Sequence, residues 1–162
     1  LEVFCAFEGC EMAIEPRQAH RPPPPMTVAP APTTHRLVHI LVVDDDPDTL
    51  RLLVRAMEEE NYAVRAATSG LEALELISAH RPDLLVLDFK MSGLDGLAIT
   101  REIRSNAATQ MMPVVMLTAM TDQASTAAGF AAGVTDYVTK PFSIPQLTAR
   151  IRACLARAQL VV

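Results

Sequence analysis

The sequence predicts one α/β domain in which five strands alternate with five helices and form a parallel sheet covered on both faces. From Leu37 onward, short apolar runs alternate with longer segments whose apolar residues recur at helical spacing, and the connections between them are short. In addition, residues 84–87 are four consecutive apolar residues that end at Asp88, a pattern typical of a central parallel strand buried on both faces. We expect this domain to span residues 36–159.

The composition excludes several other classes of protein. Half of the 162 residues are hydrophobic, which is enough for a core, and the net charge of −5 argues against nucleic-acid binding by this domain. Cys5, Cys10 and Cys154 match neither a disulfide framework nor a zinc spacing, so we expect a reducing cytoplasm. No apolar run approaches the roughly 20 residues of a membrane span, so we expect a soluble protein.

Residues 1–35 differ in kind from the rest of the chain. Proline is dense there, with a run at 22–25, and proline blocks both helices and sheet ladders. We therefore expect a disordered, proline-rich extension, which lacks the basic start and apolar core of a signal peptide. Because the chain opens on Leu1, we expect residues 1–25 to be vector-derived or to precede a natural start at Met26.

The first unit is a strand followed by a capped helix. Residues 37–43 are largely apolar and form the expected strand, after which Asp46 and Pro47 fit the N-cap and the first position of a helix. The apolar face of that helix is expected to consist of Leu50, Leu53, Val54 and Met57. Asn61 ends the helix, and residues 62–67 form the second strand.

The second and third helices flank the central strand. Residues 68–70 lead into the second helix, and Pro82 ends it before the strand. Its apolar side is expected to be Leu71, Leu74 and Ile77. The third helix begins at Asp95, and its apolar residues are Ile99 and Ile103.

The last two units complete the alternation. Residues 113–117 form the fourth strand, and Asp122 can cap an alanine-rich helix at 123–132, whose few large side chains predict weak packing. Residues 134–138 form the fifth strand, and a capping box that begins at Ser143 opens the last helix. The buried face of that helix is expected to be Ile144, Leu147, Ile151 and Leu155.

Polar residues stand where four of the five strands end. Asp44 and Asp45 follow the first strand, Asp88 ends the third, Thr118 ends the fourth, and Lys140 follows the fifth. Because the carboxyl ends of parallel strands meet at one edge, where ligands bind in such folds, we expect these side chains to form one site. Each residue taken alone has an ordinary alternative, as a solvated helix-capping acid, a strand-end hydroxyl or a surface lysine. Their joint placement is what indicates a site.

The predicted site has the chemistry of magnesium-dependent phosphoryl transfer. Three carboxylates that converge repel one another and require a cation, and oxygen ligands with few carboxylates suit Mg²⁺. A divalent ion, a lysine and a hydroxyl around one further carboxylate indicate phosphoryl transfer onto Asp88, with that carboxylate as the nucleophile.

Four motifs connect this pattern to a known family. They are Ile-Leu-Val-Val-Asp-Asp-Asp-Pro at 40–47, Leu-Asp-Phe-Lys-Met-Ser-Gly-Leu-Asp-Gly at 87–96, Leu-Thr-Ala at 117–119 and Asp-Tyr-Val-Thr-Lys-Pro-Phe at 136–142. With these motifs, the chain from Leu37 to about Gln159 resembles the receiver domain of two-component response regulators. The resemblance implies a flavodoxin-like sheet with the strand order 2-1-3-4-5.

The resemblance also implies a role for each acidic residue of the site. Asp88 would accept a phosphoryl group from a histidine kinase or a histidine phosphotransfer protein. Asp45, Asp88 and the backbone carbonyl of Lys90 would bind Mg²⁺, and Asp44 would assist through water. The protein would be a phosphoacceptor and not an enzyme with turnover of its own.

The same resemblance implies a switch. Lys140 would pair with the phosphoryl group and would precede a cis bond to Pro141. Thr118 and Tyr137 match the hydroxyl and aromatic positions that move together on activation, so the surface of the fourth helix, fifth strand and fifth helix would change. That surface would contact a downstream partner or a second copy of the chain.

Two residues depart from the family pattern. Ser92 stands where proline is usual, so we expect a less rigid loop after Asp88. Lys90 lies two residues beyond the acceptor, where it can shield the phosphoryl group without positioning a water, so we expect slow self-dephosphorylation.

Two other functions compete with the phosphorylated receiver. A phosphohydrolase with its nucleophile after the first strand would need a motif that fails here, because Asp48 occupies its last place. A receiver-like module that only binds partners, without phosphorylation, is the second alternative, and it would give no labelling at Asp88.

Overall fold

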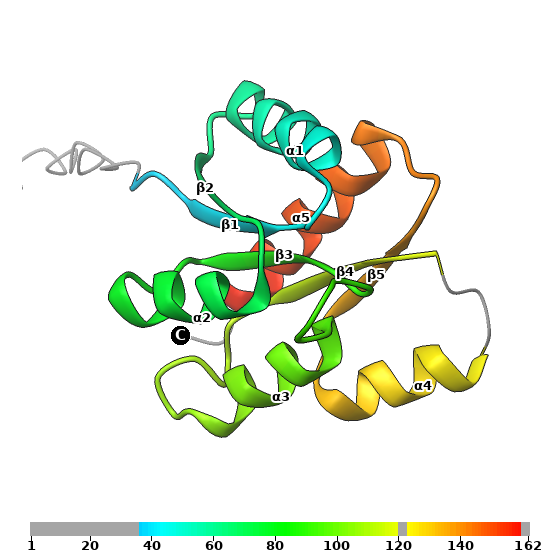
Figure 1. Cartoon of the computed structure of the whole chain (residues 1–162). Helices are drawn as coiled ribbons and strands as arrows, with labels where there is room; N and C mark the ends of the chain where they lie inside the picture. Colours follow the sequence, from blue (N-terminus) through cyan, green and yellow to red (C-terminus); the bar gives the residue numbers. More distant parts are fainter. Residues whose placement is uncertain (1–35, 120–122, 160–162) are drawn as a thin grey trace, which may run out of the picture. The chain divides into compact units, whose positions relative to one another are not determined.

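The computed structural model describes residues 36–119 and 123–159, and within them strands and helices alternate strictly (Figure 1). The strands are β1 (His39–Val43), β2 (Ala63–Ala67), β3 (Leu84–Asp88), β4 (Val114–Thr118) and β5 (Asp136–Thr139). The helices are α1 (Pro47–Glu59), α2 (Gly70–Ala79), α3 (Gly96–Ser105), α4 (Gln123–Ala132) and α5 (Ile144–Gln159). The predicted extension at 1–35 and the predicted cap at Asp122 lie outside the described residues.

All five strands pair in parallel, in the order β2-β1-β3-β4-β5. This is the flavodoxin-like order that the family resemblance implied. The strands therefore end at one common edge, and the register places Asp88 beside Leu117 and Thr118 beside Thr139. The ends of β1, β3, β4 and β5 are thereby brought next to one another.

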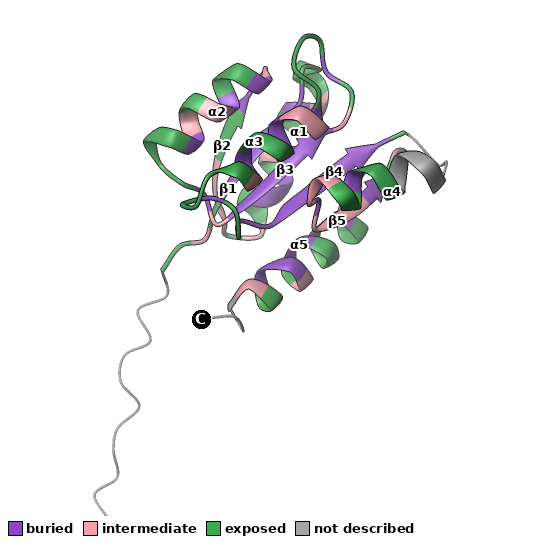
Figure 2. Cartoon of the chain, turned by 90° about the horizontal axis from the view of Figure 1, so that it is seen from below, coloured by how far each residue is buried: buried purple, intermediate pink, exposed green. Residues whose placement is uncertain are grey.

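Two helical layers cover the sheet. Helices α1 and α5 lie on one face, and α2, α3 and α4 lie on the other (Figure 1). Because side chains alternate along a strand, β1 supplies Ile40 and Val42 to the first core and Leu41 and Val43 to the second. Figure 2 shows β1, β3 and β4 largely buried in the middle and exposed residues on the outer sides of the helices.

Capping residues set the start of the helices as predicted. The carboxylate of Asp46 accepts a hydrogen bond from the backbone N–H of Thr49, with Pro47 at the first helical position. The carboxylate of Asp95 accepts one from Ala98. Gly96 follows because a Cβ there would lie 2.7 Å from the backbone oxygen of Asp88, so α3 can begin this close to β3 only at a glycine.

The prediction for the apolar face of α2 was partly wrong. Leu71 is 67% exposed, whereas Gly70, Ala73 and Ile77 are buried. Ser69 caps the helix, and a Cβ at Gly70 would lie 2.7 Å from the Cδ1 atom of Ile99. The helix therefore presents Gly70 to α3 at close range, and Leu71, one position further around the helix, faces solvent.

The fifth strand begins two residues later than predicted. Val114 donates its backbone N–H to the Oγ1 atom of Thr135, and Thr135 donates its own N–H to the carbonyl of Val114. A side-chain oxygen thus replaces one acceptor of the ladder, and regular pairing starts at Asp136.

The end of β5 has the backbone form that the family resemblance implied. The peptide bond between Lys140 and Pro141 is cis. None of the described helices is both long and apolar enough to cross a bilayer.

Candidate functional site

Three carboxylates converge at the carboxyl edge of the sheet. Asp44 follows β1 directly, Asp45 is the next residue, and Asp88 is the last residue of β3. One oxygen from each of the three lies within 4.8 Å of the others, which is the spacing of a metal-binding cluster. Asp44 and Asp88 are buried, at 1% and 6% exposure, and Asp45 is exposed. The sequence prediction of one acidic cluster at this edge agrees with this geometry.

Lys140 joins this cluster from the opposite side. Its Nζ atom donates to Asp88 Oδ1 at 2.8 Å and to Asp44 Oδ2 at 3.1 Å, across 52 and 96 positions of sequence. The backbone N–H of Lys140 donates to the carbonyl of Thr118 at 2.7 Å, which fixes the loop after β5 to the end of β4. The lysine is therefore held both at its backbone and at its ammonium group.

The remaining bonds distinguish the two buried carboxylates. Both oxygens of Asp44 accept hydrogen bonds, Oδ1 from the N–H of Asp46 and Oδ2 from Lys140. Among the described side chains, Lys140 donates to Oδ1 of Asp88. The same lysine leaves Oδ2 of Asp88 to other groups.

The charges of this cluster do not balance. Burial raises the pKa of Asp88 above its ordinary value and outweighs the bond and charge of Lys140, which lower it, while Asp44 and Asp45 raise it further. Burial lowers the pKa of Lys140, but the bonds and charges of Asp88 and Asp44 outweigh it, so the net direction is upward. Three carboxylates face one ammonium, an excess of two negative charges that a divalent cation would match. An all-oxygen donor set of this kind fits Mg²⁺.

Ser92 holds the third carboxylate. Its backbone N–H and its hydroxyl both donate to Asp45 Oδ2, each at 2.8 Å. These bonds, the backbone one first, lower the pKa of Asp45. Ser92 was predicted only to make the loop less rigid, and its link to Asp45 was not predicted. The signal was in the residue type, since a serine offers two donors where proline offers none.

Thr118, Tyr137 and Lys90 lie around the cluster. Thr118 is buried at the end of β4, next to Lys140. Lys90 is exposed in the loop after β3. The side chain of Tyr137 reaches α4 and lies against Gly129. A Cβ atom added to Gly129 would lie 1.3 Å from the tyrosine hydroxyl oxygen. Its ring meets the ring of Phe130 edge to face, with centroids 4.9 Å apart.

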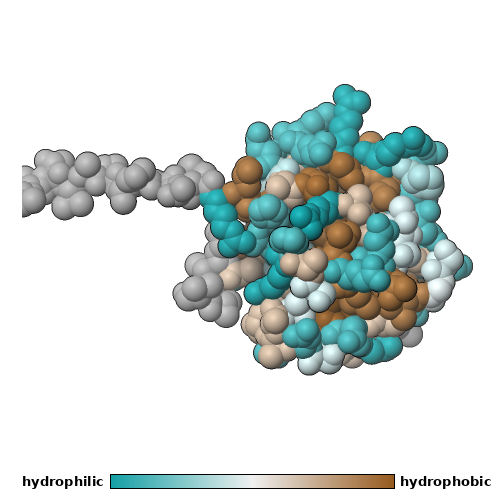
Figure 3. All heavy atoms as spheres, turned by 60° about the vertical axis from the view of Figure 1, so that its left-hand side comes forward, coloured by the Kyte–Doolittle hydropathy of each residue, from teal (hydrophilic) through white to brown (hydrophobic). Residues whose placement is uncertain are grey.

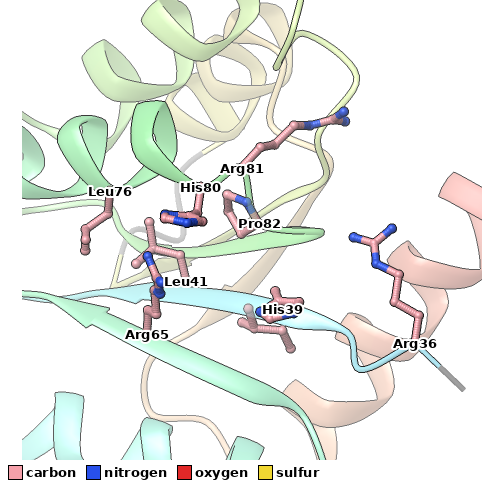
Figure 4. A pocket seen from close by; sticks show the side chains of 9 residues that line it. Arg36, His39, Leu41, Arg65, Leu76, His80, Arg81 and Pro82 are labelled. Atoms are coloured by element: carbon pink, nitrogen blue, oxygen red, sulfur yellow. The ribbon is translucent and has the colours of Figure 1, made fainter.

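A cavity of about 310 Å³ lies at the other, amino edge of the sheet and contains none of these residues. Apolar and basic side chains both line it (Figure 4). The basic residues are Arg36, His39, Arg65, His80 and Arg81. Figure 3 shows this side of the molecule, where apolar surface lies between hydrophilic groups.

The comparisons with known proteins agree on one family. Residues 40–152 match the family model of the response regulator receiver domain. The response regulator MprA of Mycobacterium ulcerans (strain Agy99) is 45% identical over 123 residues, which are 76% of this chain and 52% of that protein. The chain thus spans about half the length of the curated relatives it matches.

Solved structures give the same result. The receiver domain of the Francisella response regulator 1452 superposes with a TM-score of 0.69 and 32% identity, over 74% of this chain and 98% of that one. NtrX from Brucella abortus gives a TM-score of 0.71 and 30% identity, over 77% of this chain and 28% of that one.

Proposed function

Because this chain belongs to the response regulator receiver domain family, we propose that Asp88 accepts a phosphoryl group in a Mg²⁺-dependent reaction. The observation that carries the proposal is the arrangement of Asp88, Asp44, Asp45 and Lys140 at one edge of the sheet. The donor would be a phosphohistidine on a sensor histidine kinase or on a histidine phosphotransfer protein. The protein would work in the cytoplasm, where such kinases present their phosphohistidine.

The chain's own residues supply most of the chemistry of this step. An oxygen of Asp88 attacks the phosphorus atom, a P–O bond forms, and the P–N bond to the donor imidazole breaks, with the electron pair passing to the imidazole nitrogen. Lys140 engages Oδ1 of Asp88, which favours Oδ2 as the nucleophile. Lys140, held by Asp44, is positioned to neutralise charge on the transferred phosphoryl oxygens.

Mg²⁺ would be held by Asp45, Asp88 and the backbone carbonyl of Lys90, with Asp44 acting through water. When bound, it supplies positive charge that draws the attacking carboxylate and the phosphoryl group together. The donor oxygens and the excess of negative charge support this assignment.

The output would pass through Thr118 and Tyr137 to the surface formed by α4, β5 and α5. A phosphoryl group on Asp88 would attract the hydroxyl of Thr118, and Tyr137 would change its position against α4. The contact of Tyr137 with Gly129 and Phe130 supports this route, since Phe130 is 53% exposed on α4. A downstream partner, an output domain or a second copy of the chain would bind this surface.

The first test is labelling with acetyl phosphate, with and without Mg²⁺, in the wild type and in Asp88→Asn. Mg²⁺-dependent labelling that is lost in the variant is expected. Asp48→Asn is the matched control, because Asp48 is an exposed acid in the first turn of α1 whose partner is Arg51. If neither the wild type nor the control is labelled, the chain is a partner-binding module without phosphorylation.

A further inference from the structure

We infer that Ser92 is a positioning residue that holds Asp45 in the orientation in which it binds the cation. The inference rests on the proposed function, since it concerns the Mg²⁺ site at the carboxyl edge. It adds Ser92 to the residues that build that site.

Lys140 is shared by two carboxylates of the cluster, and Ser92 serves the third. Lys140 and the N–H of Asp46 hold Asp44, and Lys140 holds Asp88. Asp45 is exposed, and the bonds that reach it from another described residue both come from Ser92. Ser92 is 47 positions away in sequence, in the loop between β3 and α3, so the contact also joins this loop to the loop after β1.

The geometry decides between two opposite effects of these bonds. Donors on a carboxylate can compete with a cation, or they can fix the carboxylate for it. Here both donors of Ser92 engage the same oxygen of Asp45, Oδ2, and neither engages Oδ1. One oxygen of Asp45 already lies within 4.8 Å of those of Asp44 and Asp88 while the Ser92 bonds are in place. The bonds therefore fix Asp45 in a binding orientation and spare the cost of ordering an exposed side chain.

The two donors of Ser92 can be separated by substitution. Ser92→Ala removes the hydroxyl and keeps the backbone N–H, and Ser92→Thr keeps both donors. Ser92→Pro removes both. Ser105→Ala is the matched control, because the hydroxyl of Ser105 donates to the carbonyl of Glu102 at the end of α3 and touches no carboxylate of the cluster.

The test is the Mg²⁺ affinity of the full chain, measured by calorimetric titration without any phosphoryl donor. Loss of a residue that orients a metal ligand typically weakens binding by about 10-fold or more. We expect a loss of about that size in Ser92→Ala, a larger loss in Ser92→Pro, and wild-type affinity in Ser92→Thr and Ser105→Ala.

The outcomes separate this inference from the proposed function. Mg²⁺ binding that depends on Asp45, shown by its loss in Asp45→Asn, together with equal or tighter binding in Ser92→Ala, would overturn the inference and leave the proposed function intact. A wild type that binds no Mg²⁺ would overturn both.

Discussion

At the carboxyl edge of the sheet, three carboxylates and one lysine converge, and two of those carboxylates are buried. At the amino edge, three arginines and two histidines surround an open cavity. There the arginines are exposed, and Arg36, with 74% of its side chain exposed, pairs with Asp83. Each edge has an excess of one sign of charge, but among the described residues the buried charged side chains, Asp44 and Asp88, lie at the carboxyl edge. The difference teaches that burial and mutual bonding, rather than the number of charges, distinguish the candidate site from the amino edge.

The largest expected difference between the edges concerns phosphorylation. Lys140→Ala should slow labelling by acetyl phosphate by about 100-fold or more, because a preorganised donor to the transferred group is lost. Arg65→Ala and Arg81→Ala at the amino edge should leave the rate unchanged. The rates are measured with radiolabelled acetyl phosphate at fixed Mg²⁺. If the variants at both edges lost the same fraction of the labelling rate, the two edges would not differ in their role in phosphorylation.

Cation binding should stabilise the fold through the carboxyl edge alone. Mg²⁺ at about 100 times its Kd should raise the free energy of unfolding by about 2.7 kcal/mol. Urea unfolding with and without Mg²⁺ measures this gain. Asp45→Asn should lose most of it, whereas Asp83→Asn, an acid of the amino edge, should keep it. If Mg²⁺ still stabilised Asp45→Asn by the same amount, the cation would bind at another site.

The contact between Tyr137 and α4 should make Gly129→Ala unfavourable. A Gly-to-Ala change inside a helix normally gains about 1 kcal/mol, but here the added Cβ would lie 1.3 Å from the tyrosine hydroxyl oxygen. We expect a net loss of about 1–3 kcal/mol, as for overpacked cores. In a Tyr137→Ala background the same change should become neutral or stabilising in urea unfolding. A loss of equal size in both backgrounds would show that the tyrosine is not the cause.

Without divalent cations, Asp88 should make stability depend on pH. Because burial raises its pKa, the folded chain keeps the Asp88 proton to a higher pH than the unfolded chain does. Stability is therefore lost as the pH rises from about 3.8, the ordinary aspartate value, through the raised pKa. Asp88→Asn cannot lose stability in this way. The difference in free energy of unfolding between the variant and the wild type should therefore stay constant below pH 3.8 and grow in favour of the variant as the pH rises through the raised pKa of Asp88. Urea midpoints at several pH values in a chelating buffer test this, and a constant difference would contradict it.

The smallest expected effect concerns the lifetime of the phosphoryl group. Lys90 is exposed in the loop after β3, two residues beyond Asp88. It should slow self-dephosphorylation by shielding the phosphoryl group. Lys90→Asn should shorten the lifetime several-fold, measured by the decay of label after removal of acetyl phosphate. A longer lifetime in the variant would show that the lysine promotes hydrolysis.

Much of this arrangement could be predicted from the sequence. The continuous apolar run before Asp88 has the composition of a central parallel strand, and a parallel sheet brings the residues after its strands to one edge. The placement of Asp44, Asp45 and Lys140 near Asp88 follows from that geometry. The caps Asp46 and Asp95 were predictable because short oxygen-bearing side chains satisfy the N–H groups at a helix start.

Other features depend on contacts that no local pattern encodes. Leu71 and Gly70 differ in burial because α2 packs closely on Ile99, a residue of another helix. The link between Ser92 and Asp45 joins two loops 47 positions apart. The late start of β5 depends on Thr135 replacing a backbone acceptor with its hydroxyl. In each case a specific tertiary contact outweighed the local pattern.

The most direct test of the central claim is the position of the modified residue. An aspartyl phosphate is reduced by borohydride to homoserine, which mass spectrometry of peptides locates in the sequence. After treatment with acetyl phosphate and Mg²⁺, we expect homoserine at position 88. Without Mg²⁺ we expect none. Homoserine at 44 or 45, or the same yield without Mg²⁺, would contradict it.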